Sequence, residues 1–513
     1  LSDRASGDIA WRFAGDPEVK DDLQIMCPSG LATAVMIFDL PLGPAEEREV
    51  VLTCPLDPQG AAKAEPIAGV VSRWKELLGR GPGCQVPDHQ IGDLFAASES
   101  ALLASLDGTS ICPGPATYHY FWFRDAAYML LALDRLGYGS LTRAVIERFP
   151  DEQERSGMFR SQQGEWDSTG QAIWSVWNHA VHTHDLTIAE RLFPSLASGV
   201  RWIDRKRMRA PEDPLLHGLM PRGLSAEHLG LADVYYWDSF WSLAGVEAFE
   251  RICALLGRRP EMAHAHELAG ALRRDIGRSL DTAHARTGIH GIPAGPLRNI
   301  DAGMIGSVAA WYPLQLYAQD DPWMRATLDT IRGMMFRQGL FYQPFIHSGL
   351  NVYLTLHVAG ALLYAGDAEA YWKILTDVSG RATSTFTYPE AIHPVTGGGC
   401  MGDGHHGWAA AEIVLAVRNA FVAEMWGPPP DPHTVRFLSG IPCAWFDQTS
   451  PFGVEGVPIP EGRVSIRVRP QGDAVTVDRV FHRGGVVGEG RWVLSVPGQW
   501  PCVECDGREI AGQ

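Results

Sequence analysis

Between Asp93 and Val422 the chain alternates between two kinds of predicted helix, and this alternation constrains the fold more than any other feature of the sequence. One kind is amphipathic, as in residues 260–280, where apolar side chains recur every three or four positions. The other kind is apolar nearly all round, as in RDAAYMLLALDRLG and WDSFWSLAGVEAFERICALLG. A helix that is apolar on every side is buried on every side. The second kind must therefore form an inner layer that the first kind covers.

About a dozen helical segments are expected, and they begin near Leu94, Arg124, Leu141, Asp167, Leu186, Trp237, Pro260, Ala302, Pro322, Gly349, Ala368 and Gly407. Twelve helices that alternate between buried and amphipathic predict a mainly α protein built as an (α/α)6 toroid, with six helical hairpins in a double ring. In such a toroid the loops that enter the inner helices gather at one end and form a funnel. The Gly-rich and aromatic loops of this chain, such as YHYFWFRD and HPVTGGGCMGDGHHGW, lie at those entries and predict a binding site.

The two ends of the chain have a different composition pattern from the middle. Residues 1–75 contain the short β-rich runs VMIFDLPLG and REVVLTCPLD, and residues 429–513 alternate as strands do, after the Pro-rich segment WGPPPDPH. We therefore expect a β-rich N-terminal segment over residues 1–75, a helical catalytic domain over 76–428 and a β-rich C-terminal domain over 429–513.

Charge and composition narrow the class of partner. The 513 residues carry a formal net charge of −17, which argues against nucleic acid and against an anionic membrane, because both require a basic face. No apolar run approaches the roughly 20 residues needed to cross a bilayer. A small neutral molecule such as a sugar fits this charge better. The nine cysteines are scattered and odd in number, which favours reduced thiols and a cytoplasmic protein, with secretion left as an alternative.

Two carboxylates, Asp238 in YYWDSFW and Glu390 in TYPEAIHP, lie in aromatic-rich segments at the predicted funnel. Carboxylates flanked by Trp and Tyr are typical of enzymes that cleave sugars, in which one acts as an acid on the leaving oxygen and the other activates water. A helix N-terminus lowers a carboxyl pKa, whereas apolar burial raises it. If Asp238 is the acid, its aromatic surroundings must outweigh the helix dipole.

Each carboxylate also has a purely structural interpretation. Asp238 could cap its helix, and Glu390 could be a solvated loop residue. Glu227, in SAEH, is a rival acid close to Asp238 in the sequence. The glycines that follow Glu390 would let the backbone approach a ligand closely. A phosphate-binding loop is the alternative there, but the segment has neither a GxxxxGK[ST] pattern nor a lysine.

The same loop holds Asp403, His405 and His406, with His393 nearby, which raises the question of a metal ion. Adjacent histidines point in different directions on most backbones, and no second ligand cluster matches them. We therefore expect no metal and no cofactor, and we assign His405 to hydrogen bonding with a sugar, while a structural ion stays an alternative.

Arg124 and Asp125 open the helix RDAAYMLL, where they either cap the helix or grip sugar hydroxyls through charge-assisted hydrogen bonds. Tryptophans near the predicted mouth could stack on sugar faces, although each taken alone is more often a core residue. The substrate-binding candidates are Trp122, Arg124, Asp125, Trp166, Gln171, Tyr236, Trp237, Trp241, His405 and Trp408.

The order FWFRD, GLMPRGLSAEH, YYWDSFW and then YPE…GGGCMGDGHHGWAAAE resembles the (α/α)6 glycoside hydrolases, of the glucoamylase and family-63 α-glucosidase types, over about residues 90–425. The resemblance implies an inverting mechanism with Asp238 as acid, Glu390 as base, and Arg124 with Asp125 as binders of the non-reducing sugar. Glucoamylases carry a Glu-Glu pair where this chain has Asp238 and Ser239, whereas the family-63 type uses Asp. The terminal β segments are shorter than a starch-binding arrangement requires, which speaks against starch as the substrate.

The sequence thus predicts an exo-acting, inverting glycoside hydrolase that cleaves an α-linked glucoside or a short oligosaccharide. A glycoside phosphorylase of the same fold and a sugar-binding protein without catalytic activity are the alternatives. The identity of the sugar, its linkage and the oligomeric state are left open.

Overall fold

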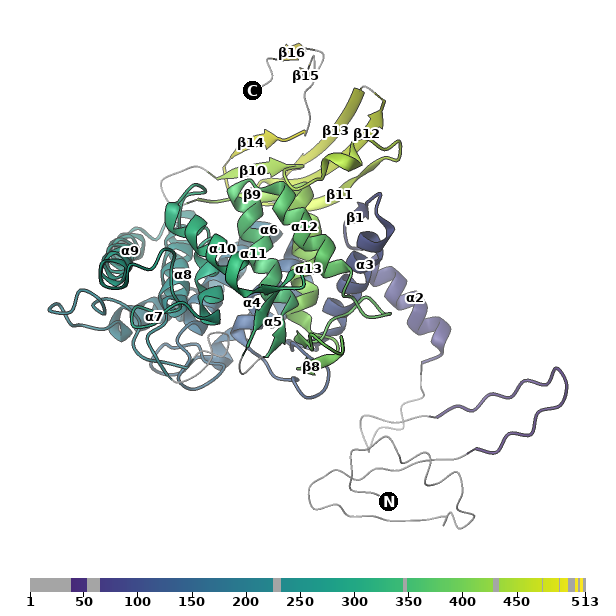
Figure 1. Cartoon of the computed structure of the whole chain (residues 1–513), viewed down its shortest axis with the longest axis horizontal. Coiled ribbons are helices and arrows are strands. Elements are labelled where there is room, and N and C mark those ends of the chain that lie inside the picture. Colours follow the sequence, from purple (N-terminus) through teal and green to yellow (C-terminus); the bar gives the residue numbers. More distant parts are fainter. Residues whose placement is uncertain are drawn as a thin grey trace, which may run out of the picture. The chain divides into compact units, whose positions relative to one another are not determined.

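The computed structural model describes residues 38–52, 65–224, 232–344, 348–427, 433–472, 474–488 and 490–496, together with the backbone of 503–505 and 508–510. The chain forms two compact units, Leu1–Ser72 and Arg73–Gln513. The second unit contains the helical domain and the C-terminal strands (Figure 1).

Six helices form a closed inner ring in the second unit, as Figure 1 shows in part. Each member contacts the next, and the last contacts the first. In ring order they are α4 (Phe123–Arg135), α6 (Ser168–Thr183), α8 (Tyr236–Leu255), the 3₁₀ helix η2 (Ala302–Ala310), α11 (Val352–Ala365) and α13 (Gly407–Phe421). Every residue of α4, η2 and α13 is buried, as expected of helices surrounded by protein on all sides.

Six outer helices alternate with the inner ones along the chain and cover them. They are α3 (His89–Ala104), α5 (Gly139–Ile146), α7 (Thr187–Lys206), α9 (Arg259–Thr287), α10 (Pro322–Met335) and α12 (Ala368–Ser379). Helix α9 buries one stripe, which includes Ala265, Leu268, Leu272 and Ile276, and exposes its charged face. The predicted (α/α)6 toroid is therefore confirmed. Although the inner helices are strongly apolar, none of the described helices has both the length and the apolarity to cross a bilayer.

The twelve predicted segments all form helices that begin within a few residues of the predicted positions. One differs in type, because residues 302–310 form a 3₁₀ helix instead of an α-helix. This segment is short and contains Gly303 and Gly306, and glycine is a poor α-helix former. Helix α2 (Ile67–Leu78) was not predicted, and the short 3₁₀ turns η1 (Phe149–Glu152) and η3 (Cys443–Trp445) complete the helical elements of the described residues.

A small five-stranded sheet lies among the loops that lead into α11 and α13. Its strands, in order, are β4 (Phe336–Arg337), β5 (Leu340–Gln343), β6 (Gly349–Leu350), β7 (Ala391–Ile392) and β8 (Gly399–Met401). Strand β6 immediately precedes α11, and β7 follows Glu390 directly. The sheet therefore fixes Glu390 close to the start of α11.

The C-terminal part is β-rich, as predicted. One sheet has the order β1 (Gly83–Gln85), β11 (Phe452–Ile459), β12 (Gly462–Gln471), β13 (Ala474–Arg483), and a second has the order β14 (Arg491–Leu494), β10 (Thr434–Phe437), β9 (Val422–Met425). Two hairpins pair β2 (Leu106–Asp107) with β3 (Ser110–Ile111) and β15 (Val503–Cys505) with β16 (Arg508–Ile510). The His184 imidazole, just after α6, lies 2.8 Å from the Ile459 carbonyl oxygen, so β11 packs at the C-terminal end of an inner helix.

The N-terminal prediction of strands is not met in the part that the structure describes. Residues 38–52 contain no strand, and residues 67–75 of the predicted β-rich segment belong to helix α2, which ends at Leu78. The run REVVLTCPLD lacks the regular alternation of polar and apolar residues that a half-buried strand needs. The remaining residues of the predicted segment lie outside the described ranges.

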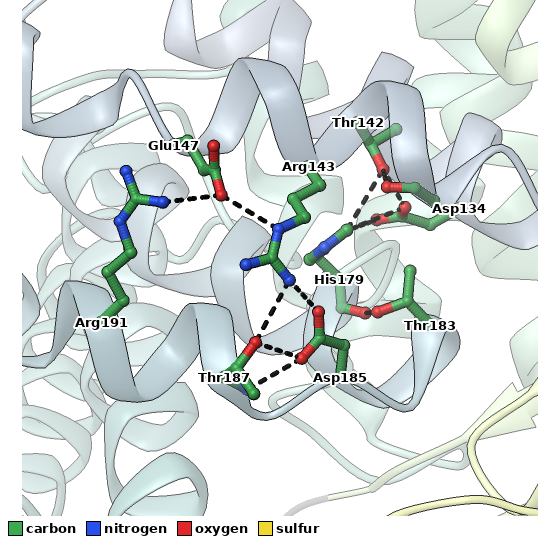
Figure 2. A network of polar contacts seen from close by, with 10 residues as sticks. Asp134, Thr142, Arg143, Glu147, His179, Thr183, Asp185, Thr187 and Arg191 are labelled. Atoms are coloured by element: carbon green, nitrogen blue, oxygen red, sulfur yellow. Dashed lines mark hydrogen bonds and ion pairs between the residues drawn. The ribbon is translucent and has the colours of Figure 1, made fainter.

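Buried polar contacts join neighbouring hairpins of the toroid, as Figure 2 shows for α4, α5 and α6. Asp134 at the end of α4 accepts a hydrogen bond from the Thr142 hydroxyl of α5, and its Oδ1 lies 3.0 Å from Nδ1 of His179 in α6. On the outer side, the Arg143 guanidinium pairs with Asp185 in the α6–α7 turn. These contacts fix three helices at one corner of the double ring.

Two glycines provide a matched test of inner-ring packing. A Cβ atom on Gly245 of α8 would lie 2.6 Å from the Cα of Gly170 in α6, whereas a Cβ on Gly277 of the outer helix α9 would meet nothing within 4 Å. We expect Gly245→Ala to lower the free energy of unfolding by about 1–3 kcal/mol through overpacking. Gly277→Ala should raise it by about 0.5–1 kcal/mol, because alanine favours the helix. Urea unfolding of both variants measures these changes, and equal effects would contradict the close approach of α6 and α8.

Candidate active site

The N-terminal ends of the inner helices meet at one end of the toroid. Each inner helix is followed by an outer helix that returns the chain, so the inner helices run in the same direction. Side-chain contacts confirm that their starts are neighbours: Arg124 of α4 bonds to Asp167 before α6, and Asp167 also bonds to Trp237 of α8. On the other side of α4, His406 before α13 lies 3.8 Å from Asp125 and packs against Tyr353 of α11.

The carboxylate of Asp167 joins three of these helices. Its Oδ2 accepts hydrogen bonds from Arg124 Nε at 2.8 Å, from Trp237 Nε1 at 2.8 Å and from Gln171 Nε2 at 3.0 Å. Asp167 is fully buried, so its negative charge is stabilised by these donors instead of by water. Sequence analysis identified Arg124, Trp237 and Gln171 as candidates but missed Asp167. The signal was present, because EWD repeats the pattern of an acid next to Trp at a helix start that YYWD shows.

Asp238 is the third residue of α8 and is 1% exposed. Neither of its side-chain oxygens has a hydrogen-bond partner among the described residues. Helix α8 has no side-chain cap at its N-cap residue, Tyr235, and Asp238 accepts no backbone hydrogen bond. The capping interpretation is therefore wrong within the described structure. A buried carboxyl group with no internal partner is costly, and such groups are typical of sites that bind a ligand.

Burial raises the pKa of the Asp238 carboxyl group well above its ordinary value, and the negative charges of Asp167 and Glu165 raise it further. The positive charge of Arg124 acts in the opposite direction but does not reverse the shift. Desolvation thus acts in the direction that the sequence analysis requires of a general acid. Asp238 is therefore suited to hold a proton near neutral pH and to release it to a substrate.

The local charge balance disfavours ionisation of Asp238. Arg124 is the cation that opposes Asp167, at 2.8 Å, and Glu165, with Nη2 at 3.4 Å from Oε2. Both of these carboxylates are buried against the guanidinium. Asp238 has no such ion pair among the described residues, so ionising it would add a further negative charge to a site where one guanidinium already faces two carboxylates. Glu165, like Asp167, was missed at the sequence level.

Glu390 is buried, at 4% exposure, in the loop immediately before β7. Gly402, which has a φ of +63°, lies so close that an added Cβ would be 2.6 Å from the Glu390 carboxylate oxygen Oε2. The glycine-rich segment thus approaches a side chain closely, where the sequence had suggested approach to a ligand. A solvated loop position for Glu390 is wrong, because the segment around Gly402 covers it.

Asp403 fastens the Gly-rich loop to the loop before α4. Its carboxylate accepts hydrogen bonds from the amides of Ala116, Thr117 and Tyr118, and from the Thr117 hydroxyl. These hydrogen bonds lower the pKa of Asp403 to about 2, against the raising effect of burial. The ring of Tyr118 in turn stacks on His406, with centroids 6.0 Å apart.

The histidines and the aspartate of this loop have separate partners. His406 faces Asp125, and Nδ1 of His393 accepts hydrogen bonds from two amides of its own turn, whereas His405 is exposed. No group of three or more potential metal ligands occurs in the described ranges. The contact of His405 with a sugar stays a prediction.

The aromatic candidates divide into two groups. Trp122 and Trp166 are partly exposed, and the buried indole Nε1 of Trp122 has no partner among the residues described. Trp237, Trp241 and Trp408 are fully buried and line the ring interior, where Trp241 packs edge-on against Trp237. Trp166 donates its indole N–H to the Arg222 carbonyl oxygen and lies under the Lys206 ammonium, 3.6 Å from its ring centroid.

Of two further substrate-binding candidates, Tyr236 lies away from the ring centre and Gln171 lies beside Asp167. Tyr236 is buried, and its hydroxyl lies 2.9 Å from the Ser279 hydroxyl of the outer helix α9, so it joins two layers instead of facing the ring centre. Helical periodicity explains this, since Tyr236 lies two residues from Asp238 and therefore on another face of α8. Gln171 is buried beside Asp167, and its Oε1 has no partner among the described residues. Glu227, the rival acid, lies outside the described residues.

Comparisons with known proteins identify the fold. No family model matches the chain, and no curated protein sequence matches it. Among solved structures, a glycosidase variant in complex with glucose has a TM-score of 0.50 at 17% identity, covering 65% of this chain and 99% of its own. A bacterial glucoamylase complexed with acarbose has a TM-score of 0.50 at 14% identity, and the match covers 69% of this chain and 58% of the glucoamylase. A GH78-family rhamnosidase of Bacillus sp. GL1 has a TM-score of 0.58 at 12% identity, and the match covers 82% of this chain and 43% of the rhamnosidase. The predicted resemblance to (α/α)6 glycoside hydrolases is thus confirmed at the level of the fold.

The unpaired state of Asp238 predicts an unusual stability change. Because its pKa is raised on folding, the folded protein binds a proton more tightly than the unfolded chain, so the free energy of unfolding falls as pH rises above about 4. Asp238→Asn removes this titration. The variant should therefore gain stability relative to the parent protein as pH increases from 4 to 8, measured by urea unfolding at several pH values.

Asp275 serves as the matched buried control. It pairs with Arg207 at 3.3 Å and with Arg278 at 2.9 Å, so Asp275→Asn should lower the free energy of unfolding by about 1–3 kcal/mol. A loss of stability in Asp238→Asn comparable to that in Asp275→Asn would contradict the assignment of Asp238 as an unpaired, protonated group.

Asp403 predicts the opposite pH dependence. Its pKa is depressed on folding to about 2, so its stabilisation is present above the unfolded value of about 4 and is lost as pH falls toward 2. Asp403→Ala should therefore destabilise the protein at pH 7, and the difference from the parent protein should shrink below pH 4. Asp329→Ala, at an exposed position of α10, is the control and should change little. Urea unfolding between pH 3 and 7 measures both, and a difference that does not depend on pH would contradict the role of Asp403.

Proposed function

We propose that this protein is a glycoside hydrolase in which Asp238 protonates the glycosidic oxygen. The observation that carries the proposal is the Asp238 carboxyl group itself, which is buried at the start of an inner helix, has no internal partner among the described residues and has a raised pKa. A general acid must be protonated at the working pH and free to donate to the leaving group. The fold, which solved glycosidases share, supports the same reaction class.

Glu390 acts as the general base in this proposal. It lies in a loop that the five-stranded sheet fixes beside the entry to α11, so it belongs to the end of the toroid where Asp238 also lies. It deprotonates a water that attacks the anomeric carbon from the face opposite to the leaving group, which inverts the anomeric configuration. An inverting enzyme requires roughly 6.5–9.5 Å between its two carboxyl groups when substrate and water are bound.

The proposed substrate is a short α-linked glucoside, cleaved from its non-reducing end. Partly exposed Trp122 would supply an aromatic face for sugar stacking, and the Arg124–Asp167 pair would orient sugar hydroxyls near Asp238. The glucose complex and the acarbose complex among similar folds support a glucoside. The rhamnosidase fold makes an α-rhamnoside the comparison substrate that the experiment must include.

Substitutions of Asp238 and Glu390 should affect kcat differently, depending on the leaving group of the substrate. Asp238→Asn and Glu390→Gln should each lower kcat by about 100-fold or more, because each removes a proton-transfer step. For substrates with a good leaving group, such as a nitrophenyl glucoside, Asp238→Asn should lose much less activity than Glu390→Gln, since protonation of the leaving oxygen is then less important. Steady-state kinetics on both substrate types measure this difference. The buried control Asp275→Asn should retain kcat in its folded fraction.

A hydrolysis screen on α-glucosides and α-rhamnosides, followed by NMR of the first anomer released, tests substrate and stereochemistry together. Release of β-glucose from an α-glucoside supports inversion. Release of α-glucose would overturn the role of Glu390 as base. Normal turnover by Asp238→Asn on unactivated glycosides would overturn the proposal as a whole.

A further inference from the structure

A cavity lies at the opposite end of the toroid from Asp238. It is formed near the C-terminal ends of the inner helices, by residues that include Arg135 of α4, Asn178 of α6, Arg251 of α8 and Asn419 of α13. Strand β9 and the residue after it, Trp426, close its edge. The predicted glycosidase chemistry makes no use of this cavity, since the acid and the base lie at the N-terminal ends.

Arg251 is a half-buried cation at the cavity. Its guanidinium has no hydrogen bond and no ion pair among the described residues. It lies 5.1 Å from the ring centroid of Trp426 and 5.9 Å from that of Trp177. Burial lowers the pKa of this guanidinium, and the charges of Glu247 and Glu250 offset the shift in part. Stacking on two indoles satisfies the face of the guanidinium but none of its N–H donors.

The nearby carboxylates are already committed to other arginines. Glu247 pairs with Arg273, and Glu424 pairs with both Arg135, at 3.1 Å, and Arg418. Arg135 and Arg251 thus line the cavity together with Glu247 and Glu424, and Arg251 is the lining guanidinium that has neither carboxylate as a close partner.

The cavity also has neutral donors and a limited size. The indole Nε1 of Trp426 is buried without a partner in the described structure, and the amides of Asn178 and Asn419 line the same space. The room open to the centres of water-sized molecules is about 60 Å³, which corresponds to roughly four water molecules. A single tetrahedral or planar oxyanion fits within this space.

We propose that this cavity binds a small oxyanion (a phosphate, sulfate or carboxylate group) between the guanidinium of Arg251 and the indole N–H of Trp426. The planar fork of the Arg251 N–H groups would take two oxygens of the anion, and Trp426 would take a third. The bound anion would supply the partner that Arg251 lacks and would join α8 to the segment after β9.

Isothermal titration of the whole protein with inorganic phosphate, sulfate and acetate, at constant ionic strength, tests this inference. We expect binding of at least one of the three anions, and a loss of affinity of about tenfold or more in Arg251→Gln. The exposed helical residue Arg325 provides the matched control, and Arg325→Gln should bind as the parent protein does. Trp426→Phe keeps the ring beside Arg251 and removes only the N–H donor, so it should weaken binding to a smaller extent.

The test of anion binding is independent of the test of the proposed hydrolysis. Asp238→Asn, which changes the other end of the toroid, should bind the anion with unchanged affinity, so loss of hydrolysis and loss of anion binding are independent outcomes. If Arg251→Gln does not fold, Trp426→Phe and an Arg251→Lys variant, which keeps the charge but not the fork, decide the question by their weaker binding. Equal affinity in the parent protein and in the folded Arg251 variants, or no binding of any of the three anions, would overturn the inference.

Discussion

The carboxylate of Asp167 is the interaction on which the candidate active site depends. It accepts hydrogen bonds from side chains of α4, α6 and α8, so a single buried charge sets the relative positions of three inner helices. The same charge raises the pKa of Asp238. Structure and chemistry are therefore coupled, because the group that fixes the helix ends also helps to keep the proposed acid protonated.

A buried carboxyl group without an internal partner costs free energy, and the toroid offsets that cost by its size. Helices α4 and α13 are buried at every residue, so a large apolar core surrounds the few polar groups at their ends. The polar groups that do have partners, such as Asp403 and Asp134, hold loops and hairpins in place. Asp238 is left without such a partner, which is the arrangement expected where a substrate must supply one.

The sequence predicted the toroid well because periodicity reports burial directly. The segment RDAAYMLLALDRLG is apolar on every face, and α4 is indeed buried at every position. The sequence could also identify Asp238 and Glu390 from their aromatic neighbours. It could not identify the partners of Asp167, because Arg124, Gln171 and Trp237 come from three helices whose relative rotation depends on packing. The sequence analysis wrongly placed Tyr236 beside the substrate, because it relied on the proximity of Tyr236 to Asp238 in the sequence. Such proximity does not specify the face of the helix on which a side chain lies.

The parallel direction of the inner helices gives the two ends of the toroid opposite chemistry. Acidic side chains occupy first turns, as Asp125 does in α4 and Asp238 in α8, whereas Arg135 ends α4 and Arg418 lies in the last turn of α13. Each helix dipole stabilises anions at its N-terminus and cations at its C-terminus. The dipoles alone would therefore lower the pKa of Asp238. Its raised value requires that desolvation and the charges of Asp167 and Glu165 together exceed the dipole effect, so any change that admits water to this end should return Asp238 to an ordinary, ionised carboxylate.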